Sequence, residues 1–184
     1  MLQQFYPYAY AESVFSIDYR VLYEKGYRGI LFDIDNTLVH HGADATPEVE
    51  ALFRAIHRIG FKTLLLTDNG QTRVERFIRN MDTPYLCEAG KPNPDCYRAA
   101  IATLQLRREQ VLMIGDQIFT DILGANRSGI ASILVKFIRL DQRARLGKRR
   151  QLERVLLTLY RHSPYHNRLG EIEKKKAQYG TEET

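Results

Sequence analysis

The chain has 184 residues, of which 44% are hydrophobic and 27% are charged, and its net charge is +5. These values are typical of a soluble globular protein, and the length suits one domain with a continuous core. No apolar run could cross a bilayer, and the amino terminus lacks a basic stretch before an apolar core, so we expect neither a membrane span nor a secretory signal. Two cysteines without metal-ligand spacing, Cys87 and Cys96, predict reduced thiols in a cytoplasmic protein.

The charge is unevenly distributed along the chain. Residues 136–184 contain 13 basic and 6 acidic residues, a net charge of +7, which leaves a net charge of −2 for residues 1–135. An acidic body joined to a basic tail suggests that the tail meets an anionic partner. A solvated helix face with a frayed end would have the same composition, so both interpretations stay open.

The elements begin with an aromatic-rich segment, residues 1–28, which we expect to be a helical lead-in that covers the core. From residue 29 to residue 135, strand-like and helix-like patterns alternate, which favours parallel βαβ units. The predicted strands are short, mostly apolar and bounded by Gly, Asp, Asn or Pro, as strands buried on both faces should be. They cover residues 29–32, 62–66, 84–87, 111–114 and 131–135.

The helices between these strands have recognisable ends. Thr46 can cap a helix whose first position is Pro47, and Gly60 ends the apolar repeat that follows. Asn93 and Pro94 open another helix in the same way. The remaining crossovers are predicted over residues 72–80 and 121–128.

A basic amphipathic helical tail is predicted for residues 136–184. Its apolar positions recur at helical spacing and are Leu152, Val155, Leu156 and Leu159. Packing on the sheet or on a second subunit is the interpretation that this pattern favours, and an anionic membrane surface is the alternative. Together the elements predict a single domain of the α/β class, a three-layer doubly wound parallel sheet of about five strands.

Polar side chains follow the ends of four predicted strands. They are Asp33, Asp35, Asn36 and Thr37 after the first strand, Thr67, Asp68 and Asn69 after the second, Lys91 after the third, and Asp116 and Asp121 after the fourth. Turn chemistry could explain the polar residues at any one strand exit. Because a doubly wound sheet binds ligands at the carboxyl ends of its strands, all four ends can converge on one crevice.

The predicted crevice combines acids with a cation and a hydroxyl. Asp33, Asp35 and Asp116 would repel one another unless a cation lay between them, and carboxylates with water suit Mg²⁺. Lys91 can pair with a carboxylate and with an anionic substrate oxygen, and Thr67 offers a hydroxyl to the same oxygens. Such a site is suited to phosphoryl transfer, in which the charge on the transferring oxygens has to be neutralised.

The order and spacing of these residues resemble the four motifs of the haloacid dehalogenase (HAD) superfamily. The motifs are matched, in order, by Asp33-x-Asp35-x-Thr37, Thr67, Lys91 and Gly115-Asp116-x-x-x-x-Asp121. Each motif alone is weak, whereas four in order, each at a predicted strand end, are specific. The resemblance covers residues 29–121 and implies a HAD-like Rossmannoid fold.

The resemblance also implies a role for each residue. Asp33 would be the nucleophile that forms an aspartyl-phosphate, and Asp35 would act as general acid and then as general base. The substrate phosphate would be bound by Asn36, Thr37, Thr67, Asp68, Asn69 and Lys91. The Mg²⁺ ligands would be Asp33, the backbone carbonyl of Asp35, and Asp116, with Asp121 either a further ligand or an orienting residue.

Neither position at which the superfamily inserts a cap is long enough to hold one. Residues 38–45 are only a short flap, and residues 68–90 hold one helix and one strand, so the chain resembles the capless subfamily III. Residues 27–38 are similar to the YqeG-like phosphatases of subfamily IIIA, which are related to phosphatidylglycerophosphate phosphatases. The resemblance implies a Mg²⁺-dependent phosphatase with an open site, suited to a phosphomonoester of a lipid head group or a macromolecule.

A nucleic-acid or ribosome-associated binding protein that uses a HAD core as scaffold is the alternative function. The basic tail permits it, but the chain has no recognised RNA-binding motif and retains the full set of catalytic side chains. The sequence leaves open the substrate and the oligomeric state. It also leaves open whether the tail meets nucleic acid, the core, or a membrane, where the enzyme would be peripheral at the inner face.

Overall fold

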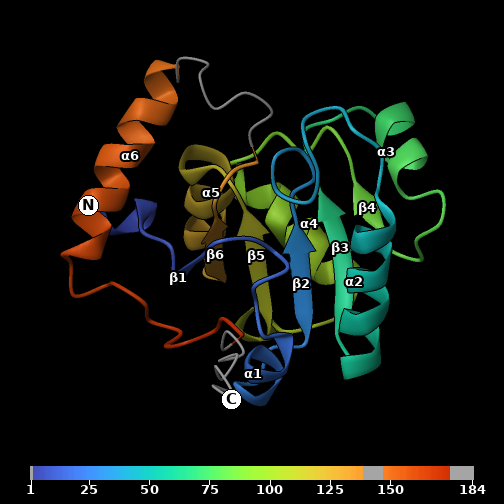
Figure 1. Cartoon of the computed structure of the whole chain (residues 1–184), viewed down its shortest axis with the longest axis horizontal. Helices are drawn as coiled ribbons and strands as arrows, with labels where there is room; N and C mark the ends of the chain where they lie inside the picture. The colour runs from blue at the N-terminus through green and yellow to red at the C-terminus, as the bar shows by residue number, and fades with distance from the viewer. Residues whose placement is uncertain (1, 139–146, 175–184) are drawn as a thin grey trace, which may run out of the picture.

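The computed structural model describes residues 2–138 and 147–174. Its centre is a parallel six-stranded sheet with the strand order β1-β6-β5-β2-β3-β4 (Figure 1). The strands are β1 (Ala9–Ala11), β2 (Gly29–Phe32), β3 (Lys62–Leu66), β4 (Tyr85–Leu86), β5 (Val111–Gly115) and β6 (Ala131–Val135). The order reverses between β2 and β5, because the chain adds β3 and β4 on one side of β2 and then β5 and β6 on the other. The predicted doubly wound α/β fold is confirmed.

A sixth strand joins the five predicted strands and lies within the predicted helical lead-in, which also contains a helix. β1 lies within residues 1–28 and pairs with β6, with Tyr10 beside Leu134. Three residues are too few for an alternating pattern to emerge from an aromatic-rich segment. β1 forms because β6 would otherwise present an unpaired edge. The predicted strand over residues 84–87 is also shorter, and Cys87 lies half-buried after its end.

Helices cover both faces of the sheet, as burial on both faces requires. Ile30 and Phe32 pack in one hydrophobic cluster, while Leu31 between them packs in the other. The first cluster includes residues of α1 (Tyr19–Glu24), α2 (Pro47–Ile59) and α3 (Gln71–Phe77), and the second those of α4 (Pro94–Leu104) and α5 (Leu123–Arg127). The shorter turns are η1 (Leu2–Phe5), η2 (Arg108–Gln110) and the π-helical η3 (Ile118–Ile122).

The predicted helix ends are confirmed. Thr46 Oγ1 accepts a hydrogen bond from the backbone N–H of Val49 at 3.4 Å, and α2 ends at Gly60, whose φ of 109° suits glycine. Asn93 Oδ1 accepts from the N–H of Asp95 at 3.0 Å and caps α4. The predicted crossover over residues 121–128 is formed by the end of η3 together with α5.

The helix α6 (Lys148–Arg161) stands at the β1–β6 edge of the sheet (Figure 1). Of its predicted apolar face only Leu156 is buried, in a cluster with Ile118 and Leu134. The other three side chains are about half exposed: Leu152 52%, Val155 55% and Leu159 47%. The predicted packing of this face on the core is therefore found for Leu156 and not for the other three side chains. The rest of the predicted tail, residues 139–146 and 175–184, lies outside the described residues.

The described chain contains no cap domain. Between β2 and α2 there is only the loop of residues 33–46, and between β3 and β4 the chain forms only α3 and its flanking turns. The predicted capless architecture is confirmed for these residues. Within the same part of the chain, no helix has the length and apolar character to cross a membrane.

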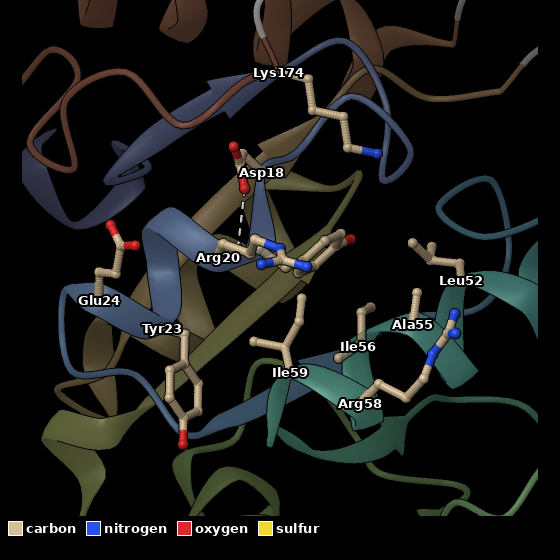
Figure 2. Close-up of a pocket in the computed structure, with 11 residues that line it drawn as sticks. Asp18, Arg20, Tyr23, Glu24, Leu52, Ala55, Ile56, Arg58, Ile59 and Lys174 are labelled. Atoms are coloured by element: carbon tan, nitrogen blue, oxygen red, sulfur yellow. Dashed lines mark hydrogen bonds between the residues drawn. The ribbon is translucent and has the colours of Figure 1, made fainter.

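A groove of about 670 Å³ lies between α1 and α2 (Figure 2). Arg20 lies on the α1 wall of the groove, and Leu52, Arg58 and Ile59 lie on the α2 wall. Because α1 leads into β2 and α2 ends just before β3, this groove lies toward the amino ends of the strands. The predicted site residues follow the opposite, carboxyl ends, so the groove is separate from them.

Asn126 of α5 ties the amino-terminal segment to the core. Its Nδ2 donates to the backbone oxygens of Gln4 at 2.8 Å and Tyr6 at 2.9 Å, and its Oδ1 accepts from Ser132 Oγ at 3.1 Å. We expect Asn126→Ala to lower the free energy of unfolding by about 1–3 kcal/mol, because these partners lose their hydrogen bonds. Urea titration followed by circular dichroism measures this loss.

Asn80→Ala is the matched control. Asn80 is exposed and donates a single hydrogen bond, to Glu50 Oε1 at 3.0 Å. Its replacement should change the free energy of unfolding by less than about 0.5 kcal/mol. Equal losses in the two variants would show that Asn126 does not hold the amino-terminal segment.

Candidate active site

Three buried carboxylates meet at the carboxyl ends of β2 and β5. Phe32 pairs with Ile114 in the sheet, so Asp33 and Asp116 follow neighbouring strands. Asp121 comes from η3, and oxygen atoms of all three carboxylates lie within 4.8 Å of one another. A Cβ on Gly115, the last residue of β5, would clash with the Asp121 carboxylate, so the close approach of Asp121 requires glycine there.

Lys91 supplies a buried cation to this group. Its Nζ donates to Asp33 Oδ1 at 2.7 Å and to Asp121 Oδ1 at 2.7 Å. Its backbone N–H donates to Asp68 Oδ1 at 3.0 Å, which holds the loop after β4 against the loop after β3. Burial alone would lower the pKa of Lys91, but Asp121 and Asp33 raise it well above its usual value, so the ammonium stays charged.

Arg150 of α6 supplies a second cation, which was not predicted from the sequence. Arg150 forms an ion pair with Asp116 Oδ2, and its Nη1 donates to the Asp116 backbone oxygen and to Glu153 Oε2, both at 2.8 Å. Glu153 is buried and its Oε1 accepts from the N–H of Ile118 at 3.0 Å. These bonds anchor α6 beside the carboxylates. No local pattern links Arg150 to Asp116, because their contact depends on the path of the chain after β6.

The carboxylates outnumber the cations, which leaves negative charge in the site. Burial raises the pKa of Asp33 to about 6 and that of Asp116 to about 7, although Lys91 and Arg150 oppose these shifts. Thr37 Oγ1 lies 3.2 Å from Asp33 Oδ2 and 3.3 Å from Asp116 Oδ1, so its hydroxyl donates to one of them at a time. Buried carboxylates with a net negative charge fit a divalent metal ion.

The Asp35 side chain points away from this group and toward the flap. Its oxygens accept hydrogen bonds from Asn69 Nδ2 and from the N–H of Gly42, both at 3.1 Å, and Arg73 Nη2 lies at 3.3 Å. The ring nitrogen Nδ1 of His41 lies 3.0 Å from Asp35 Oδ2, although the His41 side chain is 78% exposed. Residues of the flap and of α3 therefore orient Asp35. Its predicted metal contact through the backbone carbonyl stays a prediction.

A crevice of about 190 Å³ opens beside these groups. Its lining includes the predicted residues Asp33, Asp35, Asn36, Thr67, Asp68, Asn69 and Lys91. Thr67 Oγ1 accepts hydrogen bonds from the backbone N–H and the side-chain Nδ2 of Asn69, at 3.2 and 2.9 Å. Thr120 also lines the crevice, and within the described residues its buried hydroxyl has no hydrogen-bond partner. The sequence did not single out Thr120, because it lies between two motif positions.

Comparisons with known proteins agree with this fold. A family described as HAD-hydrolase-like matches residues 88–138. The probable phosphatase YqeG of Bacillus subtilis is 32% identical over 160 residues, which cover 86% of this chain and 93% of YqeG. Phosphatidylglycerophosphate phosphatase 1 (chloroplastic) of Chlamydomonas reinhardtii is 26% identical over 141 residues, 71% of this chain and 52% of that protein.

A solved structure supports the fold independently. The crystal structure of a Listeria monocytogenes protein superposes with a TM-score of 0.52 and 17% identity, and covers 72% of this chain and 98% of that one. Fold, carboxylate group and family match define one class, the HAD-like hydrolases. Because the identity with YqeG extends over most of both chains, this chain belongs to the HAD superfamily and, within it, to the family of YqeG. The resemblance found in the sequence is confirmed.

The raised pKa values of Asp33 and Asp116 predict how the stability of the metal-free protein depends on pH. The folded protein keeps protons on these carboxyls up to about pH 6 and about pH 7. In the unfolded chain an Asp carboxyl loses its proton near about pH 4. The stability that these groups contribute is therefore present below about pH 4 and is lost as pH rises toward 7, by on the order of several kcal/mol.

The Asp116→Asn variant, which cannot titrate at this position, should show a smaller decline. Urea unfolding in EDTA at about pH 4 and at about pH 7.5, the two sides of the window between the unfolded and folded pKa values, measures the difference. Asp95→Asn is the control, because Asp95 is exposed at the start of α4 and should leave the decline unchanged. A full decline in Asp116→Asn would contradict the assignment.

Proposed function

We propose that this protein is a Mg²⁺-dependent phosphatase that hydrolyses a phosphomonoester through an aspartyl-phosphate. The observation that carries the proposal is the setting of Asp33. Lys91 holds its Oδ1 at 2.7 Å and Thr37 lies 3.2 Å from its Oδ2, so the carboxylate has a fixed orientation beside the crevice. Asp33, Asp116 and Asp121 would hold Mg²⁺, a hard ion suited to carboxylate oxygens, which would neutralise charge on the phosphoryl oxygens.

The proposed reaction proceeds in two displacements. Asp33 attacks phosphorus, the bond from phosphorus to the leaving oxygen breaks, and Asp35 gives that oxygen a proton. Asp35 then takes a proton from water, whose oxygen attacks phosphorus and releases inorganic phosphate and the Asp33 carboxylate. Lys91 and Thr67 bind the phosphoryl oxygens at the crevice wall. The 14% exposure of the Asp35 side chain suits a group that exchanges protons with substrate and water.

We also propose that the substrate phosphate belongs to a lipid head group or a macromolecule. The described chain has no cap over the crevice, which favours a bulky substrate over a small metabolite that must be enclosed. The similarity to the Chlamydomonas phosphatidylglycerophosphate phosphatase supports phosphatidylglycerophosphate as a candidate. Phosphate release from this lipid, a phosphoprotein, a nucleotide and a sugar phosphate tests the proposal. A preference for the sugar phosphate would count against it.

Replacing Asp33 tests the chemistry itself. We expect Asp33→Asn to lower kcat for p-nitrophenyl phosphate by at least about 10³-fold, because the amide cannot form the acyl-phosphate bond. EDTA should abolish the parent activity and Mg²⁺ should restore it. Asp44→Asn is the control, since Asp44 lies exposed on the flap and pairs with Arg76. Turnover by Asp33→Asn at the parent rate would falsify the nucleophile assignment.

We propose in addition that α6 contacts an anionic membrane surface. Three aliphatic side chains, Leu152, Val155 and Leu159, recur at helical spacing and are about half exposed. Lys148 and Arg149, at the start of the same helix, are also exposed. A helix with exposed apolar and basic residues suits the boundary of a bilayer, where each basic residue near an anionic surface contributes about 1 kcal/mol.

Vesicle sedimentation tests this contact. The parent protein should sediment with vesicles of phosphatidylglycerol and phosphatidylcholine, and the triple variant Leu152→Ser, Val155→Ser, Leu159→Ser should remain in solution. Leu2→Ser removes an equally exposed leucine from η1 and should not change sedimentation. Salt-sensitive retention of RNA without vesicle binding, unaffected by Asp33→Asn, would favour the nucleic-acid-binding alternative instead.

A further inference from the structure

The two oxygens of the Asp35 side chain face different parts of the protein. Oδ1 accepts hydrogen bonds from the backbone N–H of Gly42 at 3.1 Å and from Arg73 Nη2 at 3.3 Å. Oδ2 accepts from Asn69 Nδ2 at 3.1 Å, and His41 Nδ1 lies 3.0 Å from it. Asn69 and His41 line the crevice of the candidate active site, whereas Gly42 and Arg73 lie outside its lining. Oδ2 is therefore the oxygen on the crevice side.

Arg73 of α3 joins Asp35 to the flap through a single nitrogen. Its Nη2 donates to Asp35 and also to the backbone oxygen of Ala43. The side chain is 14% exposed, and its Nε and Nη1 are buried without a partner among the residues that the structure describes. Because solvent and salt screen a buried pair only weakly, the Arg73 guanidinium can hold Oδ1 of Asp35 in one position.

The donors at Oδ1 leave no place there for a proton. A carboxylate oxygen offers about two acceptor sites, and at Oδ1 the N–H groups of Gly42 and Arg73 occupy both. At Oδ2 Asn69 occupies one site, and the other faces His41, whose side chain is 78% exposed and can turn away into solvent. A proton on Asp35 therefore belongs on Oδ2, from which it can be given to a group in the crevice.

We propose that Arg73 is a positioning residue that keeps Oδ1 of Asp35 as an anchor and makes Oδ2 the oxygen that carries the transferred proton. The inference rests on the proposed phosphatase function. In the first displacement the bond from phosphorus to the leaving oxygen breaks, that oxygen keeps the electron pair, and the proton passes to it from Oδ2. In the second displacement Oδ2 takes a proton from the attacking water. Arg73 does not touch the reacting atoms and acts through Asp35.

The basicity of the leaving group separates this role from a structural one. p-Nitrophenolate can leave without a proton, phenolate depends on one more strongly, and the alkoxide of benzyl alcohol depends on one most. The three corresponding phosphate esters each carry a single aromatic ring, so they make similar demands on the open crevice. Their kcat/KM values, measured with Mg²⁺ present, report the first displacement, in which Asp35 acts as the acid.

Replacing Arg73 should therefore affect the three esters unequally. Arg73→Met keeps the length of the side chain and removes its charge. We expect kcat/KM for benzyl phosphate to fall at least about tenfold and that for p-nitrophenyl phosphate by less than about threefold, because a proton donor contributes about 10²–10⁴-fold only when it is well placed. Arg73→Gln is a second uncharged variant, which keeps the test available if Arg73→Met does not fold.

A conservative variant and a matched control accompany these two. Arg73→Lys places an ammonium near Nη2, the one nitrogen that makes the polar contacts, and should recover most of the activity on benzyl phosphate. Arg76 lies on the same helix and holds the same flap through Asp44 Oδ1 and the backbone oxygen of Gly42, but its partners among the described residues do not include Asp35. Arg76→Met should leave the ratio between the esters unchanged.

The outcomes distinguish this inference from the proposed function. Equal losses for the three esters in the uncharged Arg73 variants would overturn the positioning role and leave the phosphatase proposal standing. A loss in Arg73→Lys as large as that in Arg73→Met, or the same dependence on the leaving group in Arg76→Met, would also overturn it. Absence of Asp33-dependent hydrolysis of p-nitrophenyl phosphate by the parent protein would reject the phosphatase proposal itself.

Discussion

The crowding of three buried carboxylates at the ends of β2 and β5 is the constraint on which the rest of the site depends. Asp33, Asp116 and Asp121 have oxygens within 4.8 Å of one another, and their repulsion has to be balanced inside the protein. Lys91 balances Asp33 and Asp121, and Arg150 balances Asp116. Because these two cations leave an excess of negative charge, the same crowding that strains the fold makes the site suitable for a divalent metal ion.

The two cations also connect distant parts of the chain to the sheet edge. Lys91 brings the loop after β4 to the carboxylates, and its backbone fixes that loop to Asp68. Arg150 and Glu153 bring α6 to the same edge from the opposite side. The charges that serve the proposed chemistry therefore determine where the loop and α6 lie. Removing either cation would be costly, because it would leave a buried carboxylate without its partner.

In the described part of the chain, α6 does not cover the candidate active site in the way that a cap domain would. It leaves the crevice at Asp33 and Asp35 open, and instead forms one wall of a separate cavity beside Asp116. The crevice and the cavity have different lining residues, and the crevice holds the polar side chains predicted from the strand ends.

The sequence by itself determined the five strands β2 to β6, the caps of α2 and α4, and the residues that gather at the strand ends. These features depend on short-range periodicity, on cap chemistry and on motif spacing, all of which are local. Only the tertiary structure decided that residues 9–11 form a strand, because the edge of β6 supplies its pairing. It likewise decided that Arg150 reaches Asp116 across 34 positions and that most of the apolar face of α6 stays exposed, since both depend on where the chain goes after β6.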